Sequence, residues 1–69
     1  MNRNPVTSSN IASIGYDDAS ATLEIEFKNG GIYQYFDVSQ REYEGLMSAD
    51  SHGSYLAQNI KGRYRYSKV

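Results

Sequence analysis

The C-terminal residues of this chain are the ones best suited to bind a charged ligand. Basic and aromatic side chains alternate in the last nine residues, with no acid among them: Lys61, Arg63, Tyr64, Arg65, Tyr66 and Lys68. The cations could neutralise phosphates, and the tyrosine rings could stack on unpaired bases. This segment is therefore the candidate RNA-binding site. The same pattern is also typical of a charged terminus or of an edge strand protected against aggregation.

A second aromatic pair, Tyr33 and Tyr35, lies in the middle of the chain on either side of Gln34. If both rings point outward from a sheet, they could form an aromatic platform of the kind that sheet-based RNA-binding domains use. If both point inward, they belong to the hydrophobic core. The register of the surrounding strands decides between core and platform.

Catalytic and metal chemistry have few candidate residues. The sequence contains no cysteine and one histidine, His52, which excludes a Cys–His pair and a multi-histidine metal site within one chain. His52 precedes Gly53 and is interpreted as an exposed turn residue at the start of a helix. We therefore expect a protein that is not an enzyme and that uses no cofactor and no metal.

Length and charge set the remaining limits. The 69 residues are enough for one small domain, predicted to span residues 6–69 after a flexible lead-in at residues 1–5. A formal net charge of −1 gives no overall attraction to nucleic acid. The lack of cysteine and of any long apolar run predicts a cytoplasmic protein that does not enter a membrane.

The architecture is predicted around a central hairpin. Apolar and charged residues alternate over Leu23–Lys28, which predicts a strand with one buried face. Asn29-Gly30-Gly31 predicts a tight reversal, because Asn and Gly accept the positive φ that hairpin turns need. Ile32–Phe36 predicts the returning strand. Ile11–Tyr16 predicts an earlier strand, on which alternation separates Ile11 from the face of Ile14 and Tyr16.

Two registers are open for the hairpin. A two-residue loop at Asn29-Gly30 would place Tyr33 and Tyr35 on the face of the charged residues. A three-residue loop at 28–30, with Gly30 left-handed, would place both rings beside the apolar residues of the preceding strand. The second register is favoured because it unites the strongest apolar sets on one face.

Helical signals follow the hairpin. Ser39 is a predicted N-cap, with Glu42 at the reciprocal capping-box position and facing water. A second helix is predicted over His52–Lys61 and stops at Gly62. The expected fold class is α+β: a three-stranded antiparallel meander followed by two short helices on one face, with the C-terminal segment along an edge as either a short extra strand or an extended tail. The predicted core is Ile14, Tyr16, Leu23, Ile25, Phe27, Tyr33, Tyr35, Tyr43, Leu46, Leu56 and Ile60.

Four segments in this order resemble a known family. They are SSNI at Ser8–Ile11, GYD at Gly15–Asp17, LEIEFKNGGIYQYFDV from Leu23, and YEGLMSADSHGSYLAQNIKGRYRY at Tyr43–Tyr66. The chain resembles the KTSC domain, a small module named after the C-terminus of some lysyl-tRNA synthetases, whose central YxY falls on Tyr33 and Tyr35. The resemblance implies a small bacterial or phage-type protein, and its synthetase context suggests RNA as a partner.

Two functions from different classes are therefore expected. The first is a non-enzymatic module that binds RNA, such as tRNA, through the C-terminal basic and aromatic residues. The alternative is a module that binds a protein partner or self-associates. It would use an exposed aromatic and aliphatic sheet face, to which the favoured register assigns Ile32 and Phe36.

Overall fold

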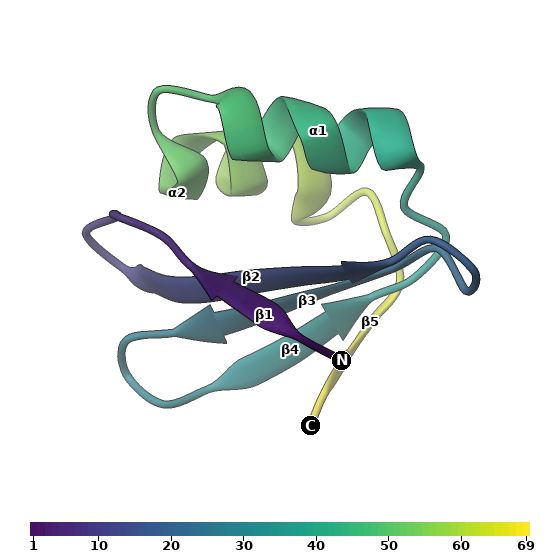
Figure 1. The fold of residues 1–69 in the computed structure, drawn as a ribbon, viewed down its shortest axis with the longest axis horizontal. Helices are drawn as coiled ribbons and strands as arrows, with labels where there is room; N and C mark the ends of the chain where they lie inside the picture. The colour runs from purple at the N-terminus through teal and green to yellow at the C-terminus, as the bar shows by residue number, and fades with distance from the viewer.

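The computed structural model describes residues 1–69 as two layers, a five-stranded antiparallel sheet and a helical layer that covers one of its faces (Figure 1). Strands adjacent in sequence are adjacent in the sheet. The strands are β1 (Arg3–Pro5), β2 (Ile11–Asp17), β3 (Thr22–Phe27), β4 (Ile32–Tyr35) and β5 (Tyr66–Lys68). The helical layer comprises α1 (Gln40–Ser48), α2 (His52–Tyr55) and the π-helical turn η1 (Leu56–Ile60). The α+β class is confirmed, and the C-terminal segment forms the edge strand β5.

The hairpin of β3 and β4 has the three-residue loop that the sequence favours. Phe27 donates its N–H to the carbonyl of Gly31 at 2.8 Å, and Gly30 has a φ of +98°. This register pairs Tyr33 with Ile25, so the YxY motif lies on the face that the helices cover. The prediction of an inward motif is therefore confirmed.

A β-bulge in β2 corrects the predicted orientation of Ile11. Ile11 pairs with Phe27, whereas Ser13 pairs with Glu26, so Ala12 is an extra residue in the ladder. The bulge turns Ile11 to the helix-covered face, where its side chain is fully buried. Simple alternation predicted the opposite face.

The N-terminus differs from its prediction as a flexible lead-in. Arg3–Pro5 forms β1 and pairs antiparallel with β2, where Arg3 lies opposite Gly15. A Cβ on Gly15 would lie 2.6 Å from the carbonyl oxygen of Asn2, so the close approach of β1 depends on this glycine.

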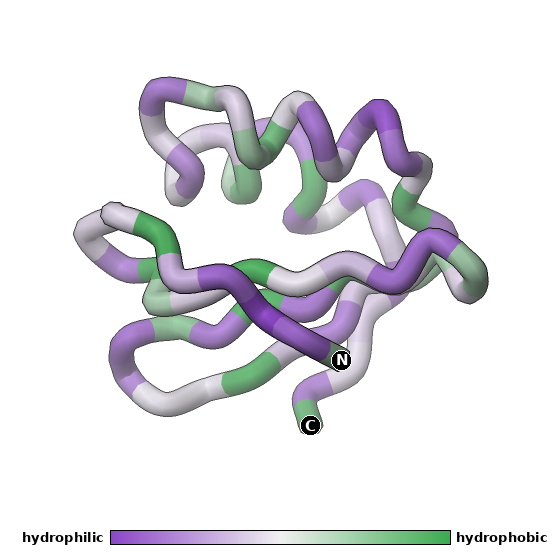
Figure 2. Tube along the Cα trace, in the orientation of Figure 1, coloured by the Kyte–Doolittle hydropathy of each residue, from purple (hydrophilic) through white to green (hydrophobic).

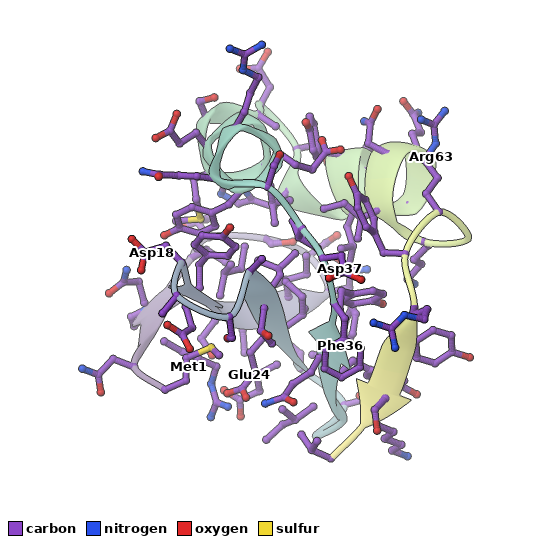
Figure 3. All side chains as sticks on the ribbon, turned by 90° about the vertical axis from the view of Figure 1, so that its right-hand side faces the viewer. Met1, Asp18, Glu24, Phe36, Asp37 and Arg63 are labelled. Carbon is purple, nitrogen blue, oxygen red and sulfur yellow. The ribbon has the colours of Figure 1, made fainter.

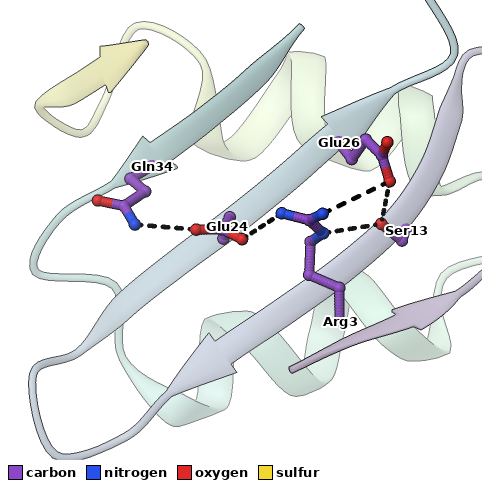
Figure 4. Close-up of polar contacts among 5 residues, drawn as sticks. All are labelled: Arg3, Ser13, Glu24, Glu26 and Gln34. Atoms are coloured by element: carbon purple, nitrogen blue, oxygen red, sulfur yellow. Dashed lines mark hydrogen bonds and ion pairs between the residues drawn. The ribbon is translucent and has the colours of Figure 1, made fainter. Parts of the chain in front are cut away.

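Glu24 belongs to a polar network on the outer face of the sheet, in which Arg3 contacts Ser13, Glu24 and Glu26 (Figure 4). The Glu24 carboxylate forms an ion pair with Arg3 and accepts a hydrogen bond from Nε2 of Gln34 at 2.9 Å. Only 7% of Glu24 is exposed. The hydrogen bond from Gln34 and then the Arg3 guanidinium lower the pKa of Glu24 below its usual value, although burial acts in the opposite direction.

This network gives the outer face a polar centre. Ser13 donates a hydrogen bond to Glu26 at 2.8 Å and accepts one from Nε of Arg3 at 3.1 Å. Ile32 and Phe36, which the favoured register assigns to this face, are half-buried. The large apolar side chains that the structure exposes are Met1, Tyr66 and Val69.

The core lies between the two layers. In Figure 2 the hydrophobic stretches of the helical layer lie on the side that faces the sheet. The buried residues of the core are Ile11, Ile14, Leu23, Ile25, Tyr35, Val38, Leu46, Leu56 and Ile60. Ile11 and Val38 are additions to the predicted core. The predicted members Tyr16, Phe27, Tyr33 and Tyr43 pack against it as half-buried residues.

The helix start at Ser39 agrees with its prediction, because the Ser39 hydroxyl accepts the N–H of Glu42 at 3.1 Å. The second helix begins after Ser51, whose hydroxyl oxygen accepts the N–H of Ser54 at 3.2 Å, and continues through η1 to Ile60. His52 is half-buried rather than exposed, and its Nδ1 lies 2.9 Å from the carbonyl oxygen of Leu46.

Candidate functional site

A groove with a volume of about 800 Å³ opens where the C-terminal residues after η1 meet the β3–β4 hairpin. Three segments line its rim: residues 9–10 before β2, residues 28–29 in the hairpin loop, and residues 61–62 after η1. The aromatic residues of the lining are Phe27, Tyr33, Tyr35 and Tyr66. The groove therefore combines the YxY motif with part of the basic and aromatic C-terminus.

The aromatic rings of the groove form one connected cluster. The ring centroid of Tyr66 lies 5.9 Å from those of both Tyr33 and Tyr35, and the Phe27 ring meets Tyr33 edge-on at 5.7 Å. Tyr35 is only 4% exposed, whereas Tyr66 is 63% exposed. Burial, then the neighbouring Tyr33 and Tyr66, raise the pKa of the Tyr35 hydroxyl. Tyr35 therefore belongs to the core, and Tyr66 offers its ring to a ligand.

Lysine side chains accompany these rings. The Nζ atom of Lys61 lies 5.3 Å from the centroid of Phe27, and that of Lys68 lies 6.0 Å from the centroid of Tyr33. Lys28 lines the groove from the hairpin loop. The lining contains no Asp or Glu, so its electrostatic character is positive.

The structure places only some residues of the predicted C-terminal RNA-binding site at the groove. Lys61 and Tyr66 line the groove, with Lys68 beside it, but the remaining three predicted residues do not line it. Arg63 is exposed and projects outward at the edge of the helical layer, on the opposite side of the sheet from Glu24 (Figure 3).

Arg65 is engaged elsewhere. Its guanidinium forms an exposed ion pair with Asp37 at 3.0 Å and lies 5.5 Å from the ring centroid of Phe36. Because Tyr66 pairs with Tyr35 on the helix-covered face, Arg65 points to the other face.

Tyr64 anchors the segment that carries the groove residues. Residues 61–66, called the strap, run from η1 to β5. The Tyr64 hydroxyl donates to Glu42 at 2.9 Å, and the Tyr55 hydroxyl donates to the same carboxylate. The hydrogen bond to Glu42 raises the pKa of Tyr55, and burial followed by the same carboxylate raises the pKa of Tyr64. The position of Glu42 on the helix predicts that it faces water. In the structure its carboxylate instead accepts hydrogen bonds from both tyrosines.

Gly45 makes this anchor possible. A Cβ there would collide with the hydroxyl oxygen of Tyr55 and lie 3.0 Å from its Cζ. A glycine inside a helix costs about 1 kcal/mol relative to alanine, so it marks a close packing contact. That signal in the sequence predicts a contact at α1, but it does not identify Glu42 as the acceptor.

Three polar residues of the groove are not predicted from the sequence to contact a ligand: Ser9, Asn10 and Asn29. The Asn29 side chain accepts a backbone hydrogen bond from Gly31 in the hairpin loop, so the loop alone accounts for an asparagine at this position. No group of three or more His, Asp and Glu side chains is placed to hold a metal ion. None of the helices has the length and apolar character required to cross a membrane.

Comparisons with known proteins agree with this architecture. Residues 7–64 match the family model of the KTSC domain. The structure is similar to the crystal structure of a KTSC domain protein from Yersinia pestis, with a TM-score of 0.96 and 44% identity, over 99% of this chain and 96% of that one.

Two sequence relatives differ greatly in length. The chain is 37% identical to an uncharacterized protein of Stutzerimonas stutzeri, over 100% of this chain and 99% of that protein. It is 38% identical to a lysine–tRNA ligase of Nostoc sp., over 86% of this chain but only 10% of the ligase. With the family model matching most of its residues, this chain belongs to the KTSC domain family.

Proposed function

We propose that this protein is a non-enzymatic module that binds a short segment of single-stranded RNA in the groove. The observation that carries the proposal is the exposed ring of Tyr66 in a groove that has Lys61 in its lining, Lys68 near its Tyr33 ring, and no carboxylates. Stacking on such a ring is worth roughly 1–3 kcal/mol per base, and lysines neutralise the adjoining phosphates.

An unpaired strand fits this site better than a duplex does. The bases of a duplex are stacked on one another, so their faces are closed to a protein ring, whereas single strands can present theirs. The aromatic lining of the groove includes the exposed ring of Tyr66, on which the face of an unstacked base can pack. We expect binding to single strands, loops and unpaired ends.

Local charge favours the groove over other surfaces. The chain as a whole has a net charge of −1, and on the outer face of the sheet the two carboxylates of Glu24 and Glu26 share a single cation, Arg3, so that this cluster stays negative. An RNA phosphate near those carboxylates is repelled, whereas near Lys28 and Lys61 it is attracted. Similarity to one tenth of a lysine–tRNA ligase supports an RNA ligand without specifying one.

The proposal is tested by fluorescence anisotropy with a labelled ten-nucleotide RNA of mixed sequence, as a single strand and as a duplex. We expect tighter binding of the single strand, weakened by added salt. Tyr66→Ala should weaken binding about fivefold or more, because one stacking contact is lost. Circular dichroism checks that this exposed substitution leaves the fold intact.

A matched pair of charge variants tests whether RNA binds in the groove. Lys61→Gln removes a cation from the groove, and Arg63→Gln removes one from an exposed position outside it. We expect Lys61→Gln to weaken binding several times more than Arg63→Gln does. Equal losses in both variants, or no binding of the single strand at low salt, would overturn the proposal.

A further inference from the structure

We propose that the groove selects an unpaired base by a keto oxygen, and so prefers guanine-type and uracil-type edges over adenine and cytosine at one position of the strand. This inference rests on the proposed RNA-binding function and specifies the ligand of that same site. It is carried by the two asparagines of the groove, whose side-chain oxygens are already used by the chain.

Asn29 has both N–H donors of its amide nitrogen left for a ligand, whereas its amide oxygen already accepts a hydrogen bond within the chain. Its Oδ1 accepts the backbone N–H of Gly31 at 3.0 Å and so stabilises the hairpin loop. The side chain must keep this orientation for the loop bond to persist. The Nδ2 group, which makes no hydrogen bond within the chain, is then a donor at the rim of the groove.

Asn10 is held in the same way. Its Oδ1 accepts the hydroxyl of Ser8 at 3.2 Å and packs on Gly53, where a Cβ would lie only 2.6 Å away. Ser8 is itself fixed, because its oxygen accepts the backbone N–H groups of Asn10 and Ile11 at 3.4 and 3.3 Å. Asn10 therefore also presents Nδ2, again a donor.

The hydrogen-bonding character of the groove follows from these constraints. An asparagine that reads adenine uses Oδ1 and Nδ2 together, to accept from N6 and donate to N7. In both Asn10 and Asn29 the Oδ1 atom already accepts one hydrogen bond within the chain, which fixes its direction, whereas Nδ2 donates none. Lys28 and Lys61 are donors only, while the tyrosine and serine hydroxyls can act in either sense. The unused hydrogen-bonding groups of the asparagines and lysines are therefore mainly donors.

A set of mainly donor groups matches keto bases. Guanine presents O6 and N7, two acceptors side by side, and uracil presents O4. Adenine and cytosine carry an amino group at the corresponding position, which would meet another donor and remain unpaired. The discrimination is therefore expected mainly as a penalty on the amino bases.

Inosine provides the sharpest test. We compare heptaadenosine RNA with the same strand carrying one central inosine, which has O6 in place of the amino group. Adenosine and inosine are closely matched in size, charge and stacking area. We expect the inosine strand to bind about tenfold more tightly, because one donor–acceptor pair replaces one unpaired donor.

Aspartate variants test whether the side-chain amides of Asn10 and Asn29 cause the base preference. Asn29→Asp and Asn10→Asp keep the oxygen that accepts from Gly31 or Ser8 and replace the Nδ2 donor by an acceptor. Both substitutions add a negative charge, which weakens the binding of either RNA strand through its phosphates. The quantity compared is therefore the ratio of the dissociation constants of the heptaadenosine strand and the inosine strand. We expect this ratio to fall below about threefold in at least one variant. Asn4→Asp, an equal charge change on β1 outside the groove, should keep the wild-type ratio.

The outcomes separate this inference from the function on which it rests. Failure of both strands to bind would overturn RNA binding and the base preference together. Binding of both strands within twofold of each other would overturn the preference alone. A tenfold ratio that persists in both aspartate variants would overturn the assignment to Asn10 and Asn29.

Discussion

The hydroxyl of Tyr64 donates a hydrogen bond to the carboxylate of Glu42 at 2.9 Å, and so joins the C-terminal strap to α1 across 22 residues of sequence. Lys61 and Tyr66, which line the groove, lie on either side of Tyr64 in the strap. One contact in the helical layer thus holds the middle of a segment whose two ends are available to a ligand.

Removing the Tyr64 hydroxyl should measurably destabilise the protein. Tyr64→Phe keeps the ring but leaves Glu42 with one donor fewer, so we expect a loss of about 1 kcal/mol in the free energy of unfolding. Urea denaturation measures it. Tyr66→Phe is the matched control, because the exposed Tyr66 hydroxyl has no partner within the chain and its removal should change little. Equal losses in both variants would contradict the anchoring role of Tyr64.

Gly45→Ala should destabilise α1 even though alanine is the better helix former. The gain in helix propensity is about 1 kcal/mol, but the added Cβ collides with the Tyr55 hydroxyl. We expect a net loss of stability in thermal denaturation and a displaced Tyr55 ring. Glu44→Ala, at the neighbouring exposed position, should change the melting temperature little. A melting temperature raised by Gly45→Ala would show that Tyr55 does not pack there.

Truncation of the two YxY tyrosines should have unequal effects. Tyr35 is 4% exposed, so Tyr35→Ala creates a cavity in the core and should cost about 3 kcal/mol or more. Tyr33 is half-buried at the groove, and Tyr33→Ala should cost clearly less. Denaturant unfolding of both variants tests this order. A reversed order would mean that Tyr33, rather than Tyr35, fills the core.

Acid should weaken the outer face of the sheet through Glu24. Because the folded-state pKa of Glu24 is lowered, its contribution is present above the unfolded pKa of about 4.3 and is lost as the pH falls through the folded pKa. We therefore expect the urea midpoint of the wild type to fall between about pH 5 and pH 2 more steeply than that of Glu24→Gln. Glu44→Gln, on the exposed side of α1, should follow the wild type. Parallel curves for all three proteins would contradict a stabilising charge on Glu24.

The sequence predicts the features that depend on local chemistry. The hairpin register follows from Gly30, which accepts a left-handed φ, and from the apolar residues that one loop length brings to one face. Ser39 is recognisable as a cap because its role depends on the N–H of Glu42, only three residues away. The order of these motifs also identifies the KTSC family.

Features that depend on distant partners are not visible in the sequence. No glycine or proline marks the bulge at Ala12, so alternation predicts the wrong face for Ile11. The strand at Arg3–Pro5 is short and polar, and it is supported by an ion pair to Glu24 that only the folded sheet creates. The groove likewise assembles segments from both ends of the chain, so its asparagines cannot be selected by motif alone.

The central claim is that RNA contacts the groove, and an amide NMR titration of the labelled protein with a single-stranded RNA tests it most directly. At low salt we expect the largest shifts at Lys61, Tyr66 and the hairpin loop 28–30, with small shifts at Arg63 and Arg65, and all shifts should shrink at high salt. Shifts centred on the outer face around Glu24, or none from a folded protein, would contradict the account.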